Sequence, residues 1–232
     1  MNLSPLLLFP LLVLRTPAAE LFAGKTLAGW SEHAADADRG TNYWKAVDGC
    51  IACDSRANPP KKAVWLQSDA EYGDFELELE VKADGTLSGN SGIQVRSRWD
   101  EKAQRVDGPQ VDIHPPDPWR VGLIYDETPG HNRWIQPSLK NWDIAPQPVP
   151  TGWTWNAGDW NTLKIRCEGT RITTWVNGVQ RADLDGRGVL DDTHHTQRNV
   201  GAKGHVFLQL HGGAKADLKF RNLRVTEIVT SP

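Results

Sequence analysis

The sequence predicts an all-β fold, an antiparallel sandwich or barrel with long surface loops. Three observations lead to this class: apolar and polar residues alternate in many short segments, turn dipeptides recur, and amphipathic helical periodicity is scarce. Alternation places successive side chains on opposite faces of a strand. Many short strands separated by turn signals are typical of antiparallel sandwiches and barrels.

The clearest alternating segment is 75–81, Phe-Glu-Leu-Glu-Leu-Glu-Val, which predicts one core face and one face of glutamates in water. Segments 163–167 and 218–220 alternate in the same way. Segment 172–176 is rich in β-branched residues and ends in Asn177-Gly178. This dipeptide predicts a tight β-hairpin, because both residues tolerate positive φ.

Turn signals also occur at Asp48-Gly49 and Asp84-Gly85. Segment 126–159 departs from the strand rhythm, since it holds five prolines and four tryptophans before alternation resumes at Leu163. Proline disrupts both helices and central strands. We expect one long irregular loop folded over the sandwich, either a lid over a binding site or a rigid structural loop.

The N-terminus predicts an export signal. An apolar run over 6–14, broken only by Pro10, precedes the small residues Ala18 and Ala19, although no basic residue comes before the run. We therefore expect a signal peptide over 1–19, one domain over 20–232, and a secreted or periplasmic protein. The run is shorter than the roughly 20 residues of a membrane-spanning helix, so no membrane span is expected.

Composition narrows the class of partner. The chain has 232 residues, 24% of them charged, and a net charge of −3, so it lacks the basic surface expected of a nucleic-acid-binding protein. Eleven tryptophans provide flat apolar surfaces, suited either to core packing or to stacking on a sugar ring. Cys50, Cys53 and Cys167 lack the second pair of a zinc site. They are expected to be small apolar residues, or one disulfide and one free thiol.

Three of the expected strands carry amide, acidic, basic or imidazole groups on the face opposite their apolar residues. These residues are Gln94 and Arg96, then Gln110, Asp112 and His114, then Gln209 and His211. Amides and guanidinium groups match sugar hydroxyls, and an acid with a base is what bond cleavage needs. An ordinary wet face would be richer in Lys, Glu and Thr. The pattern favours a carbohydrate site on neighbouring strands.

The order of motifs along the chain resembles the 3-keto-disaccharide hydrolase family. Among these motifs are Asn90-Ser91-Gly92-Ile93 and the Gly-Leu-Ile-Tyr-Asp-Glu run of 122–127. The others lie at 21–30, 44–49, 72–77, 108–113, 160–161, 177–178, 208–211 and 220–224. The resemblance spans 21–228 and implies a concanavalin A-like jelly roll of two antiparallel sheets. Pro109 stands where many members carry an aromatic residue.

The resemblance implies a hydrolase that cleaves 3-keto-glycosides. A ketone at carbon 3 acidifies the proton on carbon 2, so a base can remove it, the oxygen on carbon 1 departs, and water adds afterwards. The implied base is Asp112 or His114, and the implied acid is Glu127 or His211. Arg96 would stabilise the enolate. The implied substrate-binding residues are Gln94, Gln110, Tyr125, Gln209 and Trp134.

Other interpretations stay open. A lectin-like carbohydrate-binding module would use the same amides and tryptophans without chemistry, and an extracellular structural module would present a flat apolar patch. No metal site is assigned, although Asp112 and His114 project together and a divalent cation such as calcium would suit that face. His194 and His195 are expected in a solvated loop. The oligomeric state is left open.

Overall fold

The structure is a computed structural model, which describes residues 13–83, 90–114, 120–136, 151–152 and 154–230. One sheet has nine strands in the order β15-β14-β13-β7-β17-β5-β4, with β1 and β2 also paired to β17. Its strands are β1 (Val13–Arg15), β2 (Ala19–Glu20), β4 (Trp44–Val47), β5 (Cys50–Asp54), β7 (Phe75–Ala83), β13 (Trp160–Glu168), β14 (Arg171–Val176), β15 (Val179–Asp185) and β17 (Asp217–Thr230).

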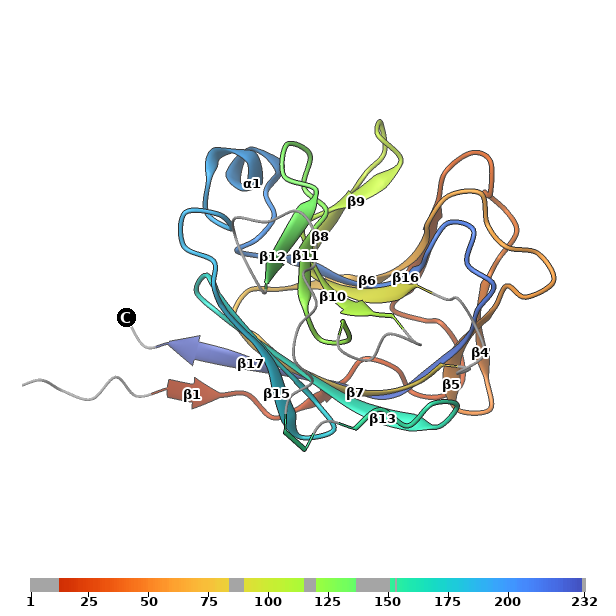
Figure 1. Ribbon diagram of the computed structural model, residues 1–232, viewed down its shortest axis with the longest axis horizontal. Helices are drawn as coiled ribbons and strands as arrows, with labels where there is room; N and C mark the ends of the chain where they lie inside the picture. Colours follow the sequence, from red (N-terminus) through yellow and green to blue (C-terminus); the bar gives the residue numbers. More distant parts are fainter. Residues whose placement is uncertain (1–12, 84–89, 115–119, 137–150, 153, 231–232) are drawn as a thin grey trace, which may run out of the picture.

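The other sheet has eight strands in the order β12-β11-β10-β8-β16-β6-β3, with β9 paired to β8. Its strands are β3 (Trp30–Ala34), β6 (Val64–Tyr72), β8 (Ser91–Asp100), β9 (Arg105–Asp107), β10 (Pro109–Ile113), β11 (Ile124–Asp126), β12 (Arg133–Gln136) and β16 (Gly204–Leu210). The described strand pairs are antiparallel. Figure 1 shows the two sheets as stacked layers, with the short helix α1 (Thr193–Arg198) beside β12. The predicted two-sheet sandwich is confirmed.

The core lies between the sheets. In β7 the predicted alternation is confirmed, because Phe75, Leu77, Leu79 and Val81 are buried against the other layer. Burying one such side chain contributes roughly 1.5–3 kcal/mol relative to leaving it in water. The opposite face of β7 carries the glutamates. We call the outer face of the nine-stranded sheet the charged face, and the outer face of the eight-stranded sheet the site face.

Turns form where the sequence indicates them. Asn177 and Gly178 have φ values of 48° and 79° and connect β14 to β15, as the hairpin prediction requires. Asp48 and Gly49 likewise have positive φ values between β4 and β5. The turn predicted at 84–85 lies outside the described residues.

The expectation of one irregular loop over 126–159 is corrected in part. Residues 133–136 form strand β12, which pairs with β11. Ile135 explains the difference, because its side chain is fully buried in the core and holds the segment against the sandwich. Residues 137–150 and 153 lie outside the described part, so the predicted lid stays a prediction.

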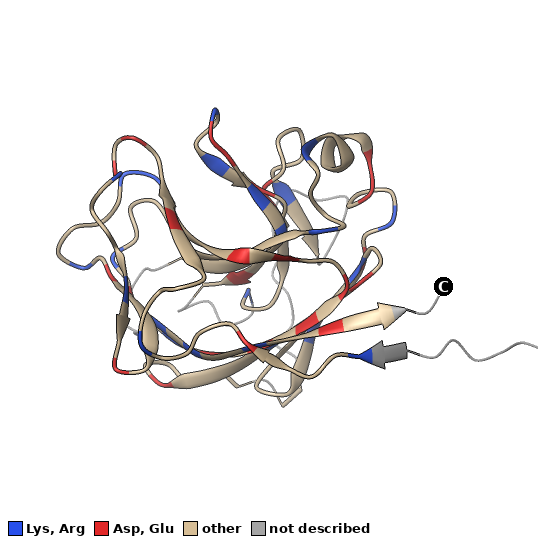
Figure 2. Ribbon diagram, turned by 180° about the vertical axis from the view of Figure 1, so that it is seen from behind, with Lys and Arg blue, Asp and Glu red and all other residues tan. Residues whose placement is uncertain are grey.

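All three cysteines are buried and free, as the expectation of small apolar residues requires. Burial raises the pKa of Cys53, and it raises that of Cys167 to about 11, so both thiols stay protonated at neutral pH. Within the described segments, helical structure does not reach the length and apolar content of a membrane-spanning helix. Figure 2 shows Lys and Arg interspersed with Asp and Glu along the chain.

Candidate functional site

Two rows of side chains cross the site face. In the first row Phe207, Gln94, Gln110, Tyr125 and Trp134 follow one another across β16, β8, β10, β11 and β12, each opposite the next. Their strand neighbours Ile93, Val111 and Leu208 belong to the core, so the row faces outward. β10, β8 and β16 are therefore adjacent, as the polar faces of the sequence predicted.

The second row joins His33, Trp65 and Gln209 across β3, β6 and β16, and Asp112 lies opposite Gly92 on β10 and β8. A side chain at Gly92 would collide with Gln110, because an added Cβ would lie 2.4 Å from the Gln110 Cδ. Glycine at this position thus lets the Gln110 amide lie over β8. From there Gln110 Nε2 donates to Asp112 Oδ1 at 3.5 Å, while Asp112 Oδ2 is buried without a hydrogen-bond partner.

Two carboxyl groups of this face have strongly raised pKa values. Burial raises the pKa of Asp112 to about 7, although the charge of Arg120 and the Gln110 hydrogen bond oppose the rise. Burial also raises the pKa of Glu127 to about 7 against the opposing charge of Arg105. The charge of Glu127 adds to the rise at Asp112. Groups with pKa values near neutrality are suited to give and take protons at physiological pH.

A cavity of about 510 Å³ opens on the site face. Glu127, Gln209 and His211 are among its polar groups, and Arg105 pairs with Glu127 across 3.4 Å. Trp65 lines the same cavity and packs with Val106 and Phe207 in a small apolar cluster separate from the core. The remaining lining residues are Ala35, Lys61, Lys62, Ala63, Ala103, Gln104 and Gly212. A few convergent polar groups beside an apolar wall are typical of ligand sites.

The structure places the predicted residues at different distances from this cavity. Glu127, Gln209 and His211 line it directly, and His211 is exposed. Asp112 and Gln110 lie on the same face but are almost fully enclosed, at 2% and 3% exposure. His114 follows the end of β10 and is half-buried. Tyr125 and Trp134 lie further along the first row, where their rings meet edge to face at 5.4 Å.

The expected position of Arg96 on this face is corrected. Gln94 pairs with Phe207 and Ser97 pairs with His205, so β8 has one residue more than β16 between these pairs, a β-bulge. Arg96 occupies the bulge with a φ of 51°, which breaks the alternation.

The Arg96 side chain is fully buried and forms hydrogen bonds to residues in the turns of the fold. Its guanidinium donates to the carbonyl oxygens of Gly73 (2.6 Å), Gly169 (2.5 Å) and Gly201 (3.2 Å), and to Asp74 Oδ1 (2.8 Å). These bonds direct the positive charge toward the turn carbonyls and Asp74. Arg96 is accordingly a structural cation, and the charges beside the carboxyls of the site face come from Arg105 and Arg120.

Gln94 has a structural role beneath the site, where it links two strands. Its side chain is fully buried, and with the amide turned to suit its neighbours Nε2 donates to the carbonyl oxygens of Pro109 and Gly108 at 3.0 and 3.2 Å. These bonds tie β8 to the start of β10. Gln94 therefore holds β8 to β10, the strand that carries Asp112. The Gly108 carbonyl oxygen also accepts from the backbone NH of Glu127, which follows β11.

Sequence reasoning missed four contributors: Trp65, Arg105, Arg120 and the Lys61–Lys62 pair. Trp65 stands between Val64 and Leu66, and three apolar residues in succession hide its outward direction. Arg105 follows a period-2 pattern with Asp107, a signal too short to detect alone. Arg120 belongs to a bend whose position next to Asp112 depends on tertiary pairing.

The expectation for the histidine pair is wrong for His195. His195 lies in α1 and is fully buried. Asp192 caps this helix and also forms a hydrogen bond with the His195 imidazole, which holds the ring inside the protein. Among the described residues, the group whose His and Asp ligand atoms converge is Asp126, His131 and His195, and it does not include Asp112 or His114.

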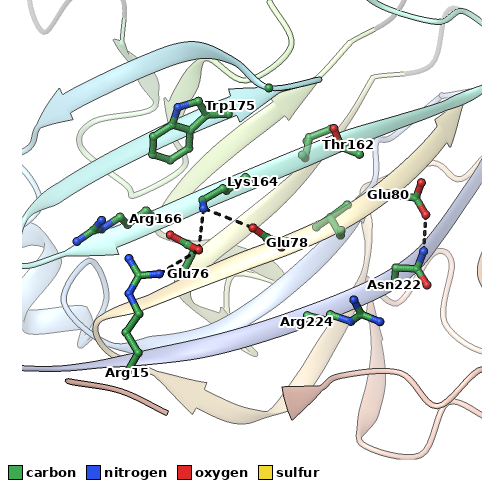
Figure 3. Close-up of a pocket in the computed structure, with 13 residues that line it drawn as sticks. Arg15, Glu76, Glu78, Glu80, Thr162, Lys164, Arg166, Trp175, Asn222 and Arg224 are labelled. Atoms are coloured by element: carbon green, nitrogen blue, oxygen red, sulfur yellow. Dashed lines mark hydrogen bonds and ion pairs between the residues drawn. The ribbon is translucent and has the colours of Figure 1, made fainter. Parts of the chain in front are cut away.

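A second cavity, of about 620 Å³, lies on the charged face (Figure 3). Several of its charges are paired: Lys164 Nζ lies 2.7 Å from Glu76 and 3.4 Å from Glu78. Arg15 also contacts Glu76, although the expected signal-peptide cleavage would remove Arg15. Arg221 lowers the pKa of Glu80 by a hydrogen bond. Because its carboxylates face cations, this surface is less suited to proton transfer than the site face.

Solved structures with this fold include carbohydrate-related proteins. One from Parabacteroides distasonis, named a "putative glycosyl hydrolase", has a TM-score of 0.59 at 19% identity, covering 90% of this chain and 98% of that one. A second of the same name and organism has a TM-score of 0.58 at 18% identity, with coverages of 90% and 93%. The carbohydrate binding module CBM66 from Bacillus subtilis has a TM-score of 0.54 at 16% identity, with coverages of 84% and 93%. At these identities the likeness shows the fold.

No curated protein sequence matches the chain. A family model does, over residues 17–226, nearly the same span as the resemblance seen in the sequence motifs. With this match, the chain belongs to the 3-keto-alpha-glucoside-1,2-lyase-like domain family.

Proposed function

We propose that this protein cleaves the glycosidic bond of 3-keto-glycosides by elimination followed by hydration, in the cavity of the site face. The observation that carries the proposal is the pair of carboxyl groups with pKa values of about 7, one of which, Glu127, lines the cavity. A neighbouring apolar wall at Trp65 would accept the flat face of a sugar ring. Membership of the family supports the same substrate class.

The reaction divides into two proton transfers. A base takes the proton from carbon 2, its electron pair forms the carbon 1–carbon 2 double bond, and the bond from carbon 1 to the glycosidic oxygen breaks. An acid gives a proton to the departing oxygen. Water then adds to carbon 1 while a proton returns to carbon 2, so the net change is hydrolysis. Glu127, which follows β11, and His211, which follows β16, both line the cavity, and we assign the exchange of these protons to them.

The other residues act around this pair. Negative charge develops on the oxygen of the carbon 3 ketone, and Arg105, one of the cations that line the cavity, lies 3.4 Å from Glu127. Gln209 offers an amide to sugar hydroxyls, since its Oε1 is buried without a hydrogen-bond partner. Asp112 lies behind Gln110, where burial and the charge of Glu127 raise its own pKa, and it would serve as base if the Gln110 amide moved.

The test is sugar release from 3-keto-glucosides beside the unoxidised glucosides, with wild type, Glu127→Gln and Asp112→Asn. We expect release from the keto substrates only and its loss in the variants. In D2O, the elimination route predicts one deuterium at carbon 2 of the product. Release without deuterium at carbon 2 would contradict the elimination, because direct hydrolysis does not break that C–H bond.

A carbohydrate-binding module without chemistry is the second candidate, and the amides and Trp65 of the site face favour it. The likeness in fold to CBM66 suits this candidate as well. Saturable binding by calorimetry with no release from any glycoside would support the binding module and reject the enzyme. We expect binding and release together.

We also propose that the protein is exported, on the strength of the apolar run at 6–14 and the small residues that follow it. N-terminal sequencing of the protein from its native host checks this. A mature chain that starts near Glu20 is expected, and an intact Met1 on protein inside the cytoplasm would contradict export.

A further inference from the structure

A cluster of histidine and aspartate side chains lies where the β11–β12 connection meets α1, apart from the cavity. Asp126, His131 and His195 each turn one ligand atom inward, and these atoms lie within 4.8 Å of one another. Asp126 and His195 are fully buried, and the His131 side chain is only 13% exposed. Figure 1 shows α1 beside the chain that joins β11 to β12, so the cluster connects segments far apart in sequence.

One oxygen of this cluster has no hydrogen-bond partner. Asp126 Oδ1 accepts from the backbone NH of Thr128 at 3.0 Å, but the buried Oδ2 accepts no hydrogen bond. His195 Nε2 lies 3.3 Å from Oδ2, but it is not aligned for a hydrogen bond to that oxygen. The hydrogen-bond partner of this nitrogen is Thr128 Oγ1, at 3.2 Å. With a neutral His195 this buried carboxylate oxygen has no partner, which is costly and signals a missing group.

The spacing suits a metal ion. Two ligands bound tetrahedrally at zinc–nitrogen and zinc–oxygen distances of roughly 2.1 Å stand about 3.4 Å apart. Asp126 Oδ2 and His195 Nε2 are 3.3 Å apart. An ion between them would give Oδ2 the partner it lacks, and Thr128 Oγ1 or a water molecule would supply a further ligand.

Asp192 orients both imidazoles. Its Oδ1 lies 2.9 Å from His195 Nδ1, which leaves Nε2 facing Asp126, and its Oδ2 lies 2.7 Å from His131 Nε2. The same carboxylate caps α1 by accepting from the His195 backbone NH at 3.0 Å. Metal-binding histidines commonly donate their other ring nitrogen to such a carboxylate, which fixes the ring and raises its basicity.

We propose that Asp126, His131 and His195 form a binding site for a divalent transition metal such as zinc, with Asp192 as the carboxylate that orients the histidines. Two imidazoles and one carboxylate suit zinc, cobalt or nickel, whereas calcium and magnesium prefer oxygen ligands. The bound ion joins α1 to the β11–β12 connection. Because Asp126 precedes Glu127, it also anchors the backbone that carries a residue of the cavity. The site does not depend on the proposed enzyme activity.

The competing explanation is an ion pair, in which a protonated His195 lies between Asp126 and Asp192 and no metal binds. Burial lowers the pKa of His195, but the neighbouring carboxylates Asp126 and Asp192 outweigh it and raise the pKa above its usual value, so such a state is chemically reasonable. A metal ion would displace that proton. Direct binding measurements separate the two explanations.

The experiment is a Co2+ titration of chelator-treated protein, followed by visible absorption and by the melting temperature with Zn2+. We expect one Co2+ per chain with the intense absorption of a tetrahedral or five-coordinate ion, and a higher melting temperature with Zn2+. His195→Gln and His131→Gln should abolish this signal, and Asp192→Asn should weaken binding by about 10- to 100-fold. Neither readout involves glycoside cleavage.

His205→Gln is the matched control, because this half-buried imidazole also contacts a carboxylate, Glu71 at 3.4 Å, but lies outside the cluster. It should bind like wild type. If His195→Gln fails to fold, His131→Gln carries the test, since that ring is partly exposed. A weak absorption typical of hydrated Co2+, no change in melting with Zn2+, or equal binding by His131→Gln would overturn the proposal.

Discussion

The two outer faces of the sandwich use acidic residues in opposite ways. On the charged face, Glu76 and Glu78 meet Lys164, and Glu80 meets Arg221 at 2.8 Å. On the site face, Asp112 has one buried oxygen without a hydrogen-bond partner, and Glu127 has Arg105 at 3.4 Å. Pairing lowers the pKa of Glu80, whereas burial raises the pKa of Asp112 and Glu127 to about 7.

The difference teaches how to choose between the two cavities. The cavity on the charged face is larger, but its carboxylates are balanced by cations, the arrangement of a solvated sheet surface. The cavity on the site face adjoins carboxyls that the fold holds in an unfavourable, partly desolvated environment. Proteins tolerate such groups mainly where their proton affinity is used.

Replacing one glutamate on each face tests this comparison most strongly. Glu127→Gln should lower sugar release from 3-keto-glucosides by about 10²- to 10⁴-fold, because the amide cannot transfer the proton. Glu78→Gln on the charged face is the matched control and should stay within about twofold of wild type, since exposed pairs contribute little. Initial rates at saturating substrate measure both. Equal effects of the two changes would remove the distinction between the faces.

Arg96 extends the comparison between paired and unpaired charges, because it is a buried charge whose guanidinium nitrogens all have hydrogen-bond partners. Arg96→Met should lower the free energy of unfolding by about 3–5 kcal/mol, because Asp74 and three turn carbonyls lose their donor. Urea denaturation measures the change, and the rate constant of the folded fraction should be retained. A variant of normal stability without activity would show that Arg96 acts in the site after all.

The pH dependence of stability should come from the site face. Asp112 and Glu127 are protonated more readily in the folded protein than in the unfolded chain, so their contribution to the unfolding free energy is largest near pH 4. This contribution to the unfolding free energy should fall as pH rises toward about 7 and stay constant above that pH. For Asp112 the total fall should be at most about 4 kcal/mol. Asp112→Asn should flatten this slope in denaturation curves taken between these pH values. An unchanged slope would mean that Asp112 is ionised throughout.

Gln209 should give the smallest of these effects. Gln209→Ala removes one amide partner for a sugar hydroxyl and should raise KM by about 5- to 10-fold with little change in kcat. Gln180→Ala in β15, an exposed amide outside the cavity, is the control and should leave KM unchanged. A larger fall in kcat than in affinity would instead place Gln209 in the chemical step.

Much of the fold follows from local patterns in the sequence. The alternation of 75–81 predicts β7 and its core face, and Asn177-Gly178 predicts the β14–β15 hairpin, because each depends on residues next to one another in the chain. The polar residues of β8, β10 and β16 predict the site face for the same reason. Strand β12 was missed because proline-rich sequence around it obscures a short segment whose stability comes from burying Ile135.

The tertiary structure decided which polar residues act together. A bulge of one residue removes Arg96 from the face to which its position in the alternation assigned it, and bulges depend on the pairing of β8 with β16. The convergence of Asp126, His131 and His195 likewise requires α1 to dock on the β11–β12 connection, 60 residues or more away along the chain. By itself the sequence determined the strongly alternating strands and the chemical character of their faces, because these depend on neighbouring residues. Burial, pKa values and side-chain convergence required the packed sandwich, because they depend on residues distant in sequence.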